Sequence, residues 1–88
     1  MIEVSIKIVN NAGLHTRPAA TIVKLASKYK SDFYISKDGL RINGKSIIGV
    51  MTMAAEKGSE LQLEFDGEDE DQMKEEICGY FNRGFDEL

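Results

Sequence analysis

The first residues of the chain alternate between apolar and polar side chains, with the apolar positions at Ile2, Val4, Ile6 and Ile8. A period of two residues is typical of a half-buried strand. After a polar loop that ends near Gly13, the period changes to that of a helix over residues 18–29. Its apolar stripe has helical spacing and consists of Ala19, Ile22, Val23, Ala26 and Tyr29. Because Pro18 suits a first turn and disfavours a helical conformation at Arg17, we expect the helix to begin within residues 16–18.

The middle of the chain predicts a hairpin followed by a short helix. Phe33 and Ile35 alternate with polar residues up to Asp38-Gly39, a strong two-residue turn signal, and residues 40–42 form the return strand. Ser46 is a good N-cap for a helix over residues 47–53.

The last third of the chain predicts one more strand and one more helix. Alternation returns in a strand that contains Leu61, Leu63 and Phe65. The acidic run 68–71 favours a helix start, because negative charge is stabilised at the positive end of a helix dipole, and we expect this run to be solvated. The apolar face of that helix consists of Met73, Ile77, Tyr80 and Phe81.

The predicted order is β-α-β-β-α-β-α, an α+β fold. The hairpin and the one-sided alternation indicate an antiparallel sheet with helices on one face. The pattern does not determine the strand order, and a ferredoxin-like arrangement would produce much the same sequence.

Composition narrows the possible functions. A length of 88 residues predicts a single domain, residues 1–88, because domains usually contain roughly 100–150 residues. With 11 basic against 15 acidic residues the net charge is −4, which argues against a nucleic-acid partner. No apolar run is long enough to span a membrane, and the amino end lacks the features of a signal peptide, so we expect a cytoplasmic protein. Cys78 has no partner for a disulfide, and one histidine excludes a multi-histidine metal site.

The lone histidine, His15, lies where the loop meets the first helix. Free N–H groups at a helix N-terminus form an anion site, and the positive end of the dipole disfavours a charged imidazole there. Arg17 can offer a planar guanidinium to a phosphoryl group. These features suit transient attachment of a phosphoryl group to a neutral imidazole nitrogen. From the residues alone, a histidine near an arginine is as often incidental as functional.

Two motifs together resemble a known family. Residues 12–19 (Ala-Gly-Leu-His-Thr-Arg-Pro-Ala), followed some thirty residues later by 45–51 (Lys-Ser-Ile-Ile-Gly-Val-Met), resemble HPr, the histidine-containing phosphocarrier of the bacterial phosphoenolpyruvate:sugar phosphotransferase system. The resemblance covers essentially the whole chain and is closest to the Gram-positive type. It implies an open-faced sandwich in which three helices cover a four-stranded antiparallel sheet.

The resemblance also implies roles for residues. His15 matches the histidine that receives a phosphoryl group on Nδ1 from Enzyme I and passes it to an Enzyme IIA, so the protein would be a covalent carrier and not an enzyme. Arg17 matches the active-site arginine, Pro18 matches the proline that opens the helix, and Thr16 stands where alanine is commoner. No cofactor is implied beyond the phosphoryl group itself, and we expect a monomer.

The short second helix has two apolar arcs, and one amphipathic face accounts for only one of them. Full burial is the alternative, which a protein of this size can rarely provide. The resemblance assigns Ile47, Ile48 and Met51 to an exposed surface that contacts Enzyme I and other partners, with Val50 and Met53 facing the core. Ala20 and Lys24 of the first helix would extend this surface, although a solvated side chain is the more ordinary interpretation of Lys24.

Ser46 has a second role in many relatives. Beyond capping a helix, the matching serine is phosphorylated by HPr kinase/phosphorylase, and the product acts with a catabolite-control transcription factor. Two alternatives therefore stay open: a protein that serves mainly as a cofactor of catabolite repression, and a regulatory phosphocarrier of the nitrogen branch.

Three further positions bear on the site, on a turn and on the packing of the last helix. Ala12 stands where several relatives carry a hydroxyl or amide side chain, so any contact from such a side chain to the phosphoryl group is lost. Ala54 stands where glycine is frequent, which predicts an altered turn after the short helix. We interpret Cys78, beside the apolar stripe of the last helix, as a packing residue.

Overall fold

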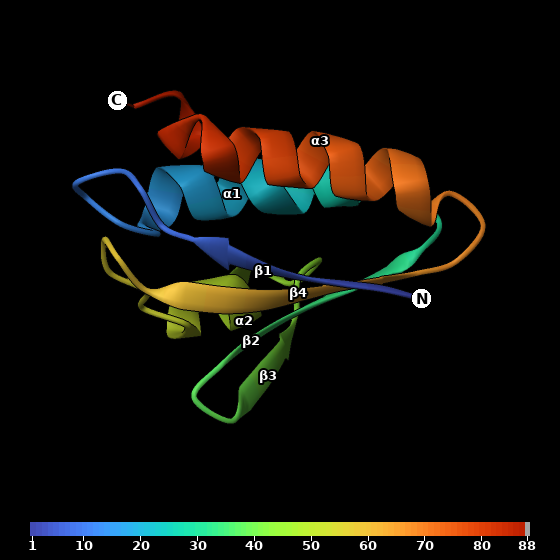
Figure 1. Ribbon diagram of the computed structural model, residues 1–88, viewed down its shortest axis with the longest axis horizontal. Coiled ribbons are helices and arrows are strands. Elements are labelled where there is room, and N and C mark those ends of the chain that lie inside the picture. Colours follow the sequence, from blue (N-terminus) through green and yellow to red (C-terminus); the bar gives the residue numbers. More distant parts are fainter. Residues whose placement is uncertain (88) are drawn as a thin grey trace.

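The computed structural model describes residues 1–87 and is an α+β fold in which helices pack on one face of a sheet (Figure 1). In chain order the elements are β1 (Ile2–Lys7), α1 (Thr16–Ala26), β2 (Asp32–Lys37), β3 (Leu40–Asn43), α2 (Ile47–Thr52), β4 (Glu60–Asp66), α3 (Glu70–Asn82) and a short 3-10 helix, η1 (Gly84–Asp86). The predicted class and element order are confirmed, and η1 is an addition that the sequence pattern did not predict.

The sheet has the strand order β1-β4-β2-β3, and every neighbouring pair is antiparallel. This is the strand order, which the sequence pattern did not determine. On the covered face, Ile35 lies opposite Leu63, and Phe33 lies opposite Phe65 with the two rings stacked 5.0 Å apart. These side chains are almost fully buried, so they fix the register: a slip of one residue would turn them all to solvent.

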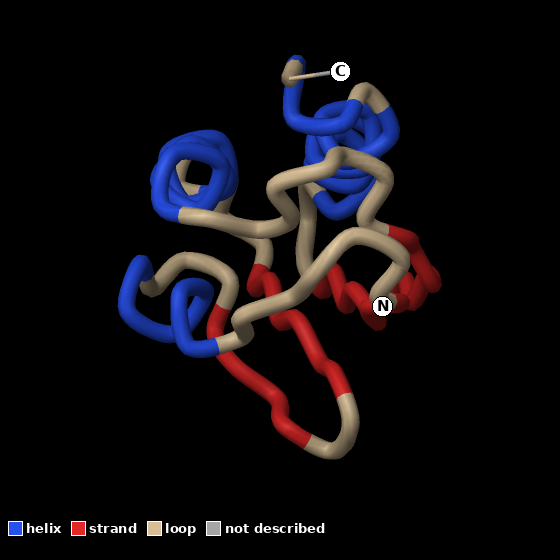
Figure 2. Tube along the Cα trace, turned by 90° about the vertical axis from the view of Figure 1, so that its left-hand side faces the viewer, coloured by secondary structure: helices blue, strands red, loops and turns tan. Residues whose placement is uncertain are grey.

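The helices form a layer over this apolar face. α3 lies over β1 and β4, α2 lies beside β3, and α1 packs against both other helices (Figure 2). The predicted stripe of α1 is confirmed in its buried residues Ala19, Ile22 and Ala26, and that of α3 in Met73, Ile77, Tyr80 and Phe81. No helix within residues 1–87 combines the length and apolarity needed to cross a membrane.

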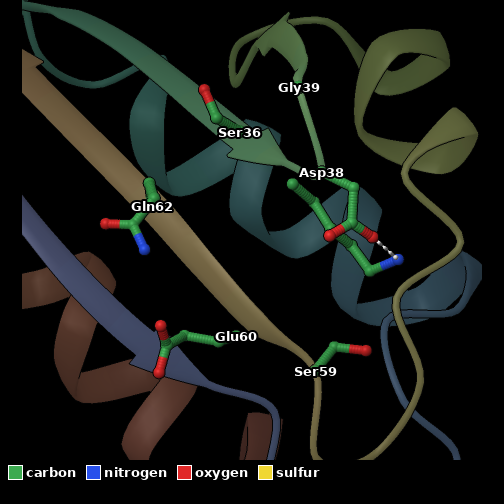
Figure 3. A pocket seen from close by; sticks show the side chains of 7 residues that line it. Ser36, Asp38, Gly39, Ser59, Glu60 and Gln62 are labelled. Carbon is green, nitrogen blue, oxygen red and sulfur yellow. Dashed lines mark hydrogen bonds and ion pairs between the residues drawn. The ribbon is translucent and has the colours of Figure 1, made fainter.

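The other face of the sheet is uncovered and polar. It carries a shallow hollow lined by Ser36, Lys37, Asp38, Gly39, Ser59, Glu60 and Gln62 (Figure 3). Glu60 and Gln62 are exposed and alternate along β4 with buried Leu61, which points to the helices. The hollow is therefore separate from the covered face and does not include His15.

The first helix ends earlier than predicted, at Ala26 and not at Tyr29. The Ser27 hydroxyl donates to the Val23 carbonyl at 2.7 Å, and the Tyr29 amide donates to the Ala26 carbonyl at 3.1 Å. The latter is a bond between residues three apart, which tightens the chain into turns and ends the α-helix. The Tyr29 side chain nevertheless packs against the core, as the stripe predicted.

The expectation that the acidic run is simply solvated is wrong for two of its residues. Asp69 accepts hydrogen bonds from the amides of Lys30 and Ser31 and from the Ser31 hydroxyl. Glu70 accepts from the Gly67 amide at 3.0 Å and pairs with the amino terminus at 3.0 Å. These carboxylates tie the start of α3 to the turn before β2 and to the beginning of β1, contacts between segments that lie far apart in the sequence.

Asp69 makes the stability of the fold depend on pH. The Ser31 hydroxyl and the amides of Lys30 and Ser31 lower the pKa of Asp69 from 3.8 to about 2. A carboxyl whose pKa is lower in the folded state stabilises the fold above its unfolded pKa, and that contribution is lost as the pH falls toward the folded value. We predict that Asp69→Asn lowers the free energy of unfolding near neutral pH, and that its difference from wild type shrinks between about pH 4 and about pH 2.

Urea denaturation at several pH values measures this difference. Asp71→Asn is the matched control, because Asp71 is an exposed residue in the same first turn of α3. If the destabilisation by Asp69→Asn is the same at pH 2 and near neutral pH, the assignment is wrong.

Candidate functional site

The loop before α1 is held against the loop after α2. The Leu14 amide donates to the Ala55 carbonyl at 2.8 Å, and both side chains are buried. Gly13 has a φ of 71°, and a Cβ there would lie 2.5 Å from the Ala55 carbonyl oxygen. Only glycine fits this conformation and this approach without strain, so Gly13 fixes the direction in which the chain enters α1.

His15 occupies the N-cap position of α1, and its imidazole forms no capping hydrogen bond. The Ala19 amide donates to the His15 carbonyl at 3.0 Å and closes the first turn. The helix begins at Thr16, within the predicted range, and buried Pro18 lies in the first turn as predicted. The amides of Thr16 and Arg17 precede the first intrahelical bond and have no acceptor within the helix, whereas Pro18 has no amide hydrogen.

Thr16 and Arg17, the two residues that follow His15, are exposed. In the described part of the chain, residues 1–87, the Arg17 guanidinium forms no ion pair. A guanidinium at this place can pair with an anion that approaches the start of α1. Ala20 and Lys24, also on α1, are exposed, and Lys24 lies in the last turn of the helix.

A carboxylate that sequence reasoning missed contacts the histidine. Glu87 lies 72 positions after His15, and its Oε2 is 2.7 Å from His15 Nε2. Figure 1 shows the C-terminal segment at the same end of the molecule as the loop that enters α1. No sequence period or motif marks this contact, because Glu87 lies far from His15 along the chain.

The two apolar arcs of α2 are separated as predicted. Val50 and Met53 are buried, whereas Ile47, Ile48 and Met51 are 37%, 75% and 46% exposed. α2 packs against α1, so this exposed apolar surface adjoins the helix that His15 precedes (Figure 2). An exposed isoleucine pair with a methionine on one short helix is typical of a contact surface.

Ser46 is the N-cap of α2, as predicted. Its hydroxyl oxygen accepts from the Gly49 amide at 3.2 Å. The residue is half-buried, next to exposed Ile47, so a change of charge at Ser46 would act directly on the exposed surface of α2.

The structure also places the remaining residues that sequence analysis singled out. Ala12 is exposed in the loop before α1 and contributes no polar side-chain atom to the site. Ala54 has a φ of 47°, so the turn keeps the left-handed conformation typical of glycine although an alanine occupies it. Cys78 is half-buried against the core, which agrees with packing, and burial raises the pKa of its thiol.

The arrangement is suited to binding an anion at a nucleophilic nitrogen. It combines an imidazole that is 40% exposed, two helix amides without intrahelical acceptors and a guanidinium that forms no ion pair with another described residue. Within residues 1–87, no three or more histidine, cysteine, aspartate or glutamate side chains are grouped as metal ligands.

Comparisons with known proteins identify the family of the chain. Residues 2–83 match the family model described as the PTS HPr component phosphorylation site. The phosphocarrier protein HPr of Treponema pallidum is 44% identical over 87 residues, covering 99% of both chains. The HPr-like protein Crh of Bacillus subtilis is 38% identical, covering 91% of this chain and 94% of Crh.

The fold comparison gives the same result. A crystal structure of HPr from Thermoanaerobacter tengcongensis superimposes with a TM-score of 0.95 at 38% identity, covering 100% of this chain and 99% of the other. The family match over most of the chain, the identity to curated relatives and the shared open-faced sandwich lead to one conclusion. The chain belongs to the HPr family of phosphocarrier proteins of the phosphotransferase system.

Proposed function

We propose that this chain carries a phosphoryl group on Nδ1 of His15, accepting it from Enzyme I and donating it to an Enzyme IIA domain in the cytoplasm as a monomer. The observation that carries the proposal is the exposed imidazole at the N-terminus of α1, two residues before Arg17, whose guanidinium forms no ion pair within residues 1–87. Membership of the HPr family supplies the phosphotransferase context.

Phosphoryl transfer to His15 requires the protein mainly to position the reacting groups and to balance the charges on the imidazole and the phosphoryl group. The Nδ1 lone pair forms a bond to phosphorus while the bond between phosphorus and the donor breaks, and that electron pair leaves with the donor. The amides of Thr16 and Arg17 and the Arg17 guanidinium then face the phosphoryl oxygens, where donors fixed in advance stabilise negative charge. Because the bond to nitrogen is labile, the same groups allow the reverse process toward an acceptor protein.

His15 and Arg17 have separable effects on labelling. With phosphoenolpyruvate and Enzyme I, we predict that the wild-type chain gains one phosphoryl group and that His15→Ala gains none. Arg17→Ala should still be labelled, but about 10- to 100-fold more slowly, because it loses a charged donor to the phosphoryl oxygens. Intact-mass measurement over time checks both expectations. Labelling of His15→Ala at the wild-type level would rule out this acceptor.

We assign Ile47, Ile48 and Met51 of α2, with Ala20 and Lys24 of α1, to the surface that docks against Enzyme I and Enzyme IIA. The support is the exposure of the apolar side chains and the contact between α1 and α2, which keeps this surface close to the start of α1. Apolar side chains bind partners by excluding water, and a methionine adapts to more than one partner surface.

Ile48 allows a test without disturbing the core, because it is 75% exposed. We predict that Ile48→Glu raises the KM of Enzyme I for this chain by about tenfold or more, since a buried charge in an apolar contact is costly. Leu40→Glu is the matched control: Leu40 is 47% exposed but lies on the edge strand β3. Equal KM values for the two variants would remove α2 from the docking surface.

Ser46 is the proposed regulatory site, phosphorylated by HPr kinase/phosphorylase. A phosphate there adds about −1.5 to −2 charges beside Ile47, which disfavours an apolar or acidic partner. Relatedness to Crh supports a second candidate function, in which phospho-Ser46 acts with a catabolite-control transcription factor. The presence of His15 favours a dual role, and a regulatory role in the nitrogen branch stays open; a neighbouring gene for Enzyme I, the kinase or a sugar Enzyme II would distinguish these.

The charge effect at Ser46 can be separated from loss of the helix cap. We predict that Ser46→Asp lowers the rate of phosphoryl transfer from Enzyme I about three- to tenfold, because it places a negative charge at the docking surface. Ser46→Asn keeps a good N-cap without the charge and should transfer at the wild-type rate. Initial rates of labelling measure the difference, and an unchanged rate for Ser46→Asp would refute regulation through charge at this position.

A further inference from the structure

The second imidazole nitrogen of His15 is occupied by a carboxylate from the far end of the chain. Glu87 Oε2 lies 2.7 Å from His15 Nε2, and its other oxygen, Oε1, lies 2.9 Å from Asn10 Nδ2. Asn10 is 1% exposed and its Nδ2 also donates to the Gly13 carbonyl at 2.9 Å. Both partners of Nδ2 are acceptors, which determines the orientation of the Asn10 amide. The buried Asn10 side chain thereby fixes the position of the Glu87 carboxylate.

The position of Glu87 depends on an unusual backbone. The residues of η1, Gly84, Phe85 and Asp86, have φ values of 63°, 58° and 59°, so η1 is a left-handed turn that follows α3 after Arg83. This conformation costs roughly 1–2 kcal/mol for each residue that has a Cβ. The Phe85 ring is buried, 5.2 Å from the Tyr80 ring and 5.0 Å from the Phe81 ring, and this packing offsets the cost.

This turn directs the end of the chain to the imidazole. The Glu87 amide donates to the Gly84 carbonyl at 3.0 Å, and the Arg83 side chain donates to Asp86 at 2.7 Å. The Glu87 side chain is only 23% exposed in this position. Strained backbone is often found at functional sites, so the strained turn suggests that the Glu87 side chain has a function.

We propose that Glu87 is a positioning residue for phosphoryl transfer: its carboxylate, anchored by Asn10, holds the proton of His15 on Nε2 and leaves the Nδ1 lone pair as the nucleophile. The inference rests on the proposed function of His15. A carboxylate oxygen accepts a hydrogen bond and cannot donate one, so in this contact Nε2 must carry the hydrogen. In the neutral ring Nδ1 is then unprotonated.

The same contact favours the product of the transfer. When Nδ1 bonds to phosphorus, the proton stays on Nε2 and the donor retains the electron pair of the broken bond, so the ring gains a positive charge. The Glu87 carboxylate faces that charge, as the aspartate does in a serine-protease triad. The phosphoryl oxygens lie on the Nδ1 side, toward the helix amides and Arg17, so two separate groups of residues balance the two opposite charges.

NMR spectra of the imidazole test the first part of this proposal, that Glu87 holds the proton of His15 on Nε2. His15 is the only histidine, so long-range 1H–15N spectra of the labelled protein contain one imidazole. At about pH 8.5, well above the ordinary histidine pKa of about 6.5, we expect wild type to show a protonated Nε2 and an unprotonated Nδ1. Glu87→Ala should lose the slowly exchanging Nε2 proton and show a larger share of the other tautomer. Glu87→Gln has one acceptor oxygen for the two donors, His15 Nε2 and Asn10 Nδ2, and should lie between Glu87→Ala and wild type. Asp86→Asn removes one charge from the same turn and should leave the tautomer of the imidazole unchanged.

Kinetics test the second part with the same variants, phosphoenolpyruvate and Enzyme I. We expect kcat to fall about tenfold in Glu87→Ala and less in Glu87→Gln, with KM within about twofold of wild type, the signature of an interaction that strengthens in the transition state. Asp86→Asn should retain the wild-type kcat. A wild-type tautomer together with a wild-type or higher kcat in Glu87→Ala would overturn the positioning role. If wild type itself takes up no phosphoryl group, the proposed function fails, a result distinct from a labelled wild type with an unaffected Glu87→Ala.

Discussion

The pairing of β4 with β1 on one side and β2 on the other is the interaction on which the rest of the structure depends. Leu61, Leu63 and Phe65 point from β4 into the helix layer and are fully buried. The loop before β4 bonds to Ile8 on one side and holds Leu14 through Ala55. Burial of one strand in the middle of the sheet thereby sets the position of the loop that carries His15.

Three separate segments meet around the imidazole. The loop after β1 provides Asn10 and Gly13, the first turn of α1 provides the free amides and Arg17, and the turn after α3 provides Glu87. A phosphocarrier has to hold its group firmly enough to travel with it and loosely enough to release it. An exposed site whose charges are balanced from two sides meets both needs without enclosing the group, because donors fixed in place require little rearrangement at transfer.

Local patterns predicted much of this protein because their causes are local. The stripe of α1, the capping of α2 by Ser46 and the division of α2 into a buried and an exposed arc follow from side-chain spacing along a helix. Pro18 and the apolar stripe that follows it placed His15 and Arg17 at a helix start, which made them a candidate anion site. Predictions failed where a distant partner intervened: Asp69 bonds to the turn at 30–31, a contact that nothing in the acidic run reveals.

By itself, the sequence determined which segments are strands and helices, which faces are apolar, and that the lone histidine lies at a helix start. Tertiary structure alone decided the strand order, because antiparallel pairing is compatible with several arrangements of the same elements. It also decided the partner of Nε2, since the packing of α3 on the sheet and the burial of Phe85 in the core place Glu87 beside His15. Spacing along the chain encodes contacts within an element, whereas contacts between elements depend on how the chain packs around a single core.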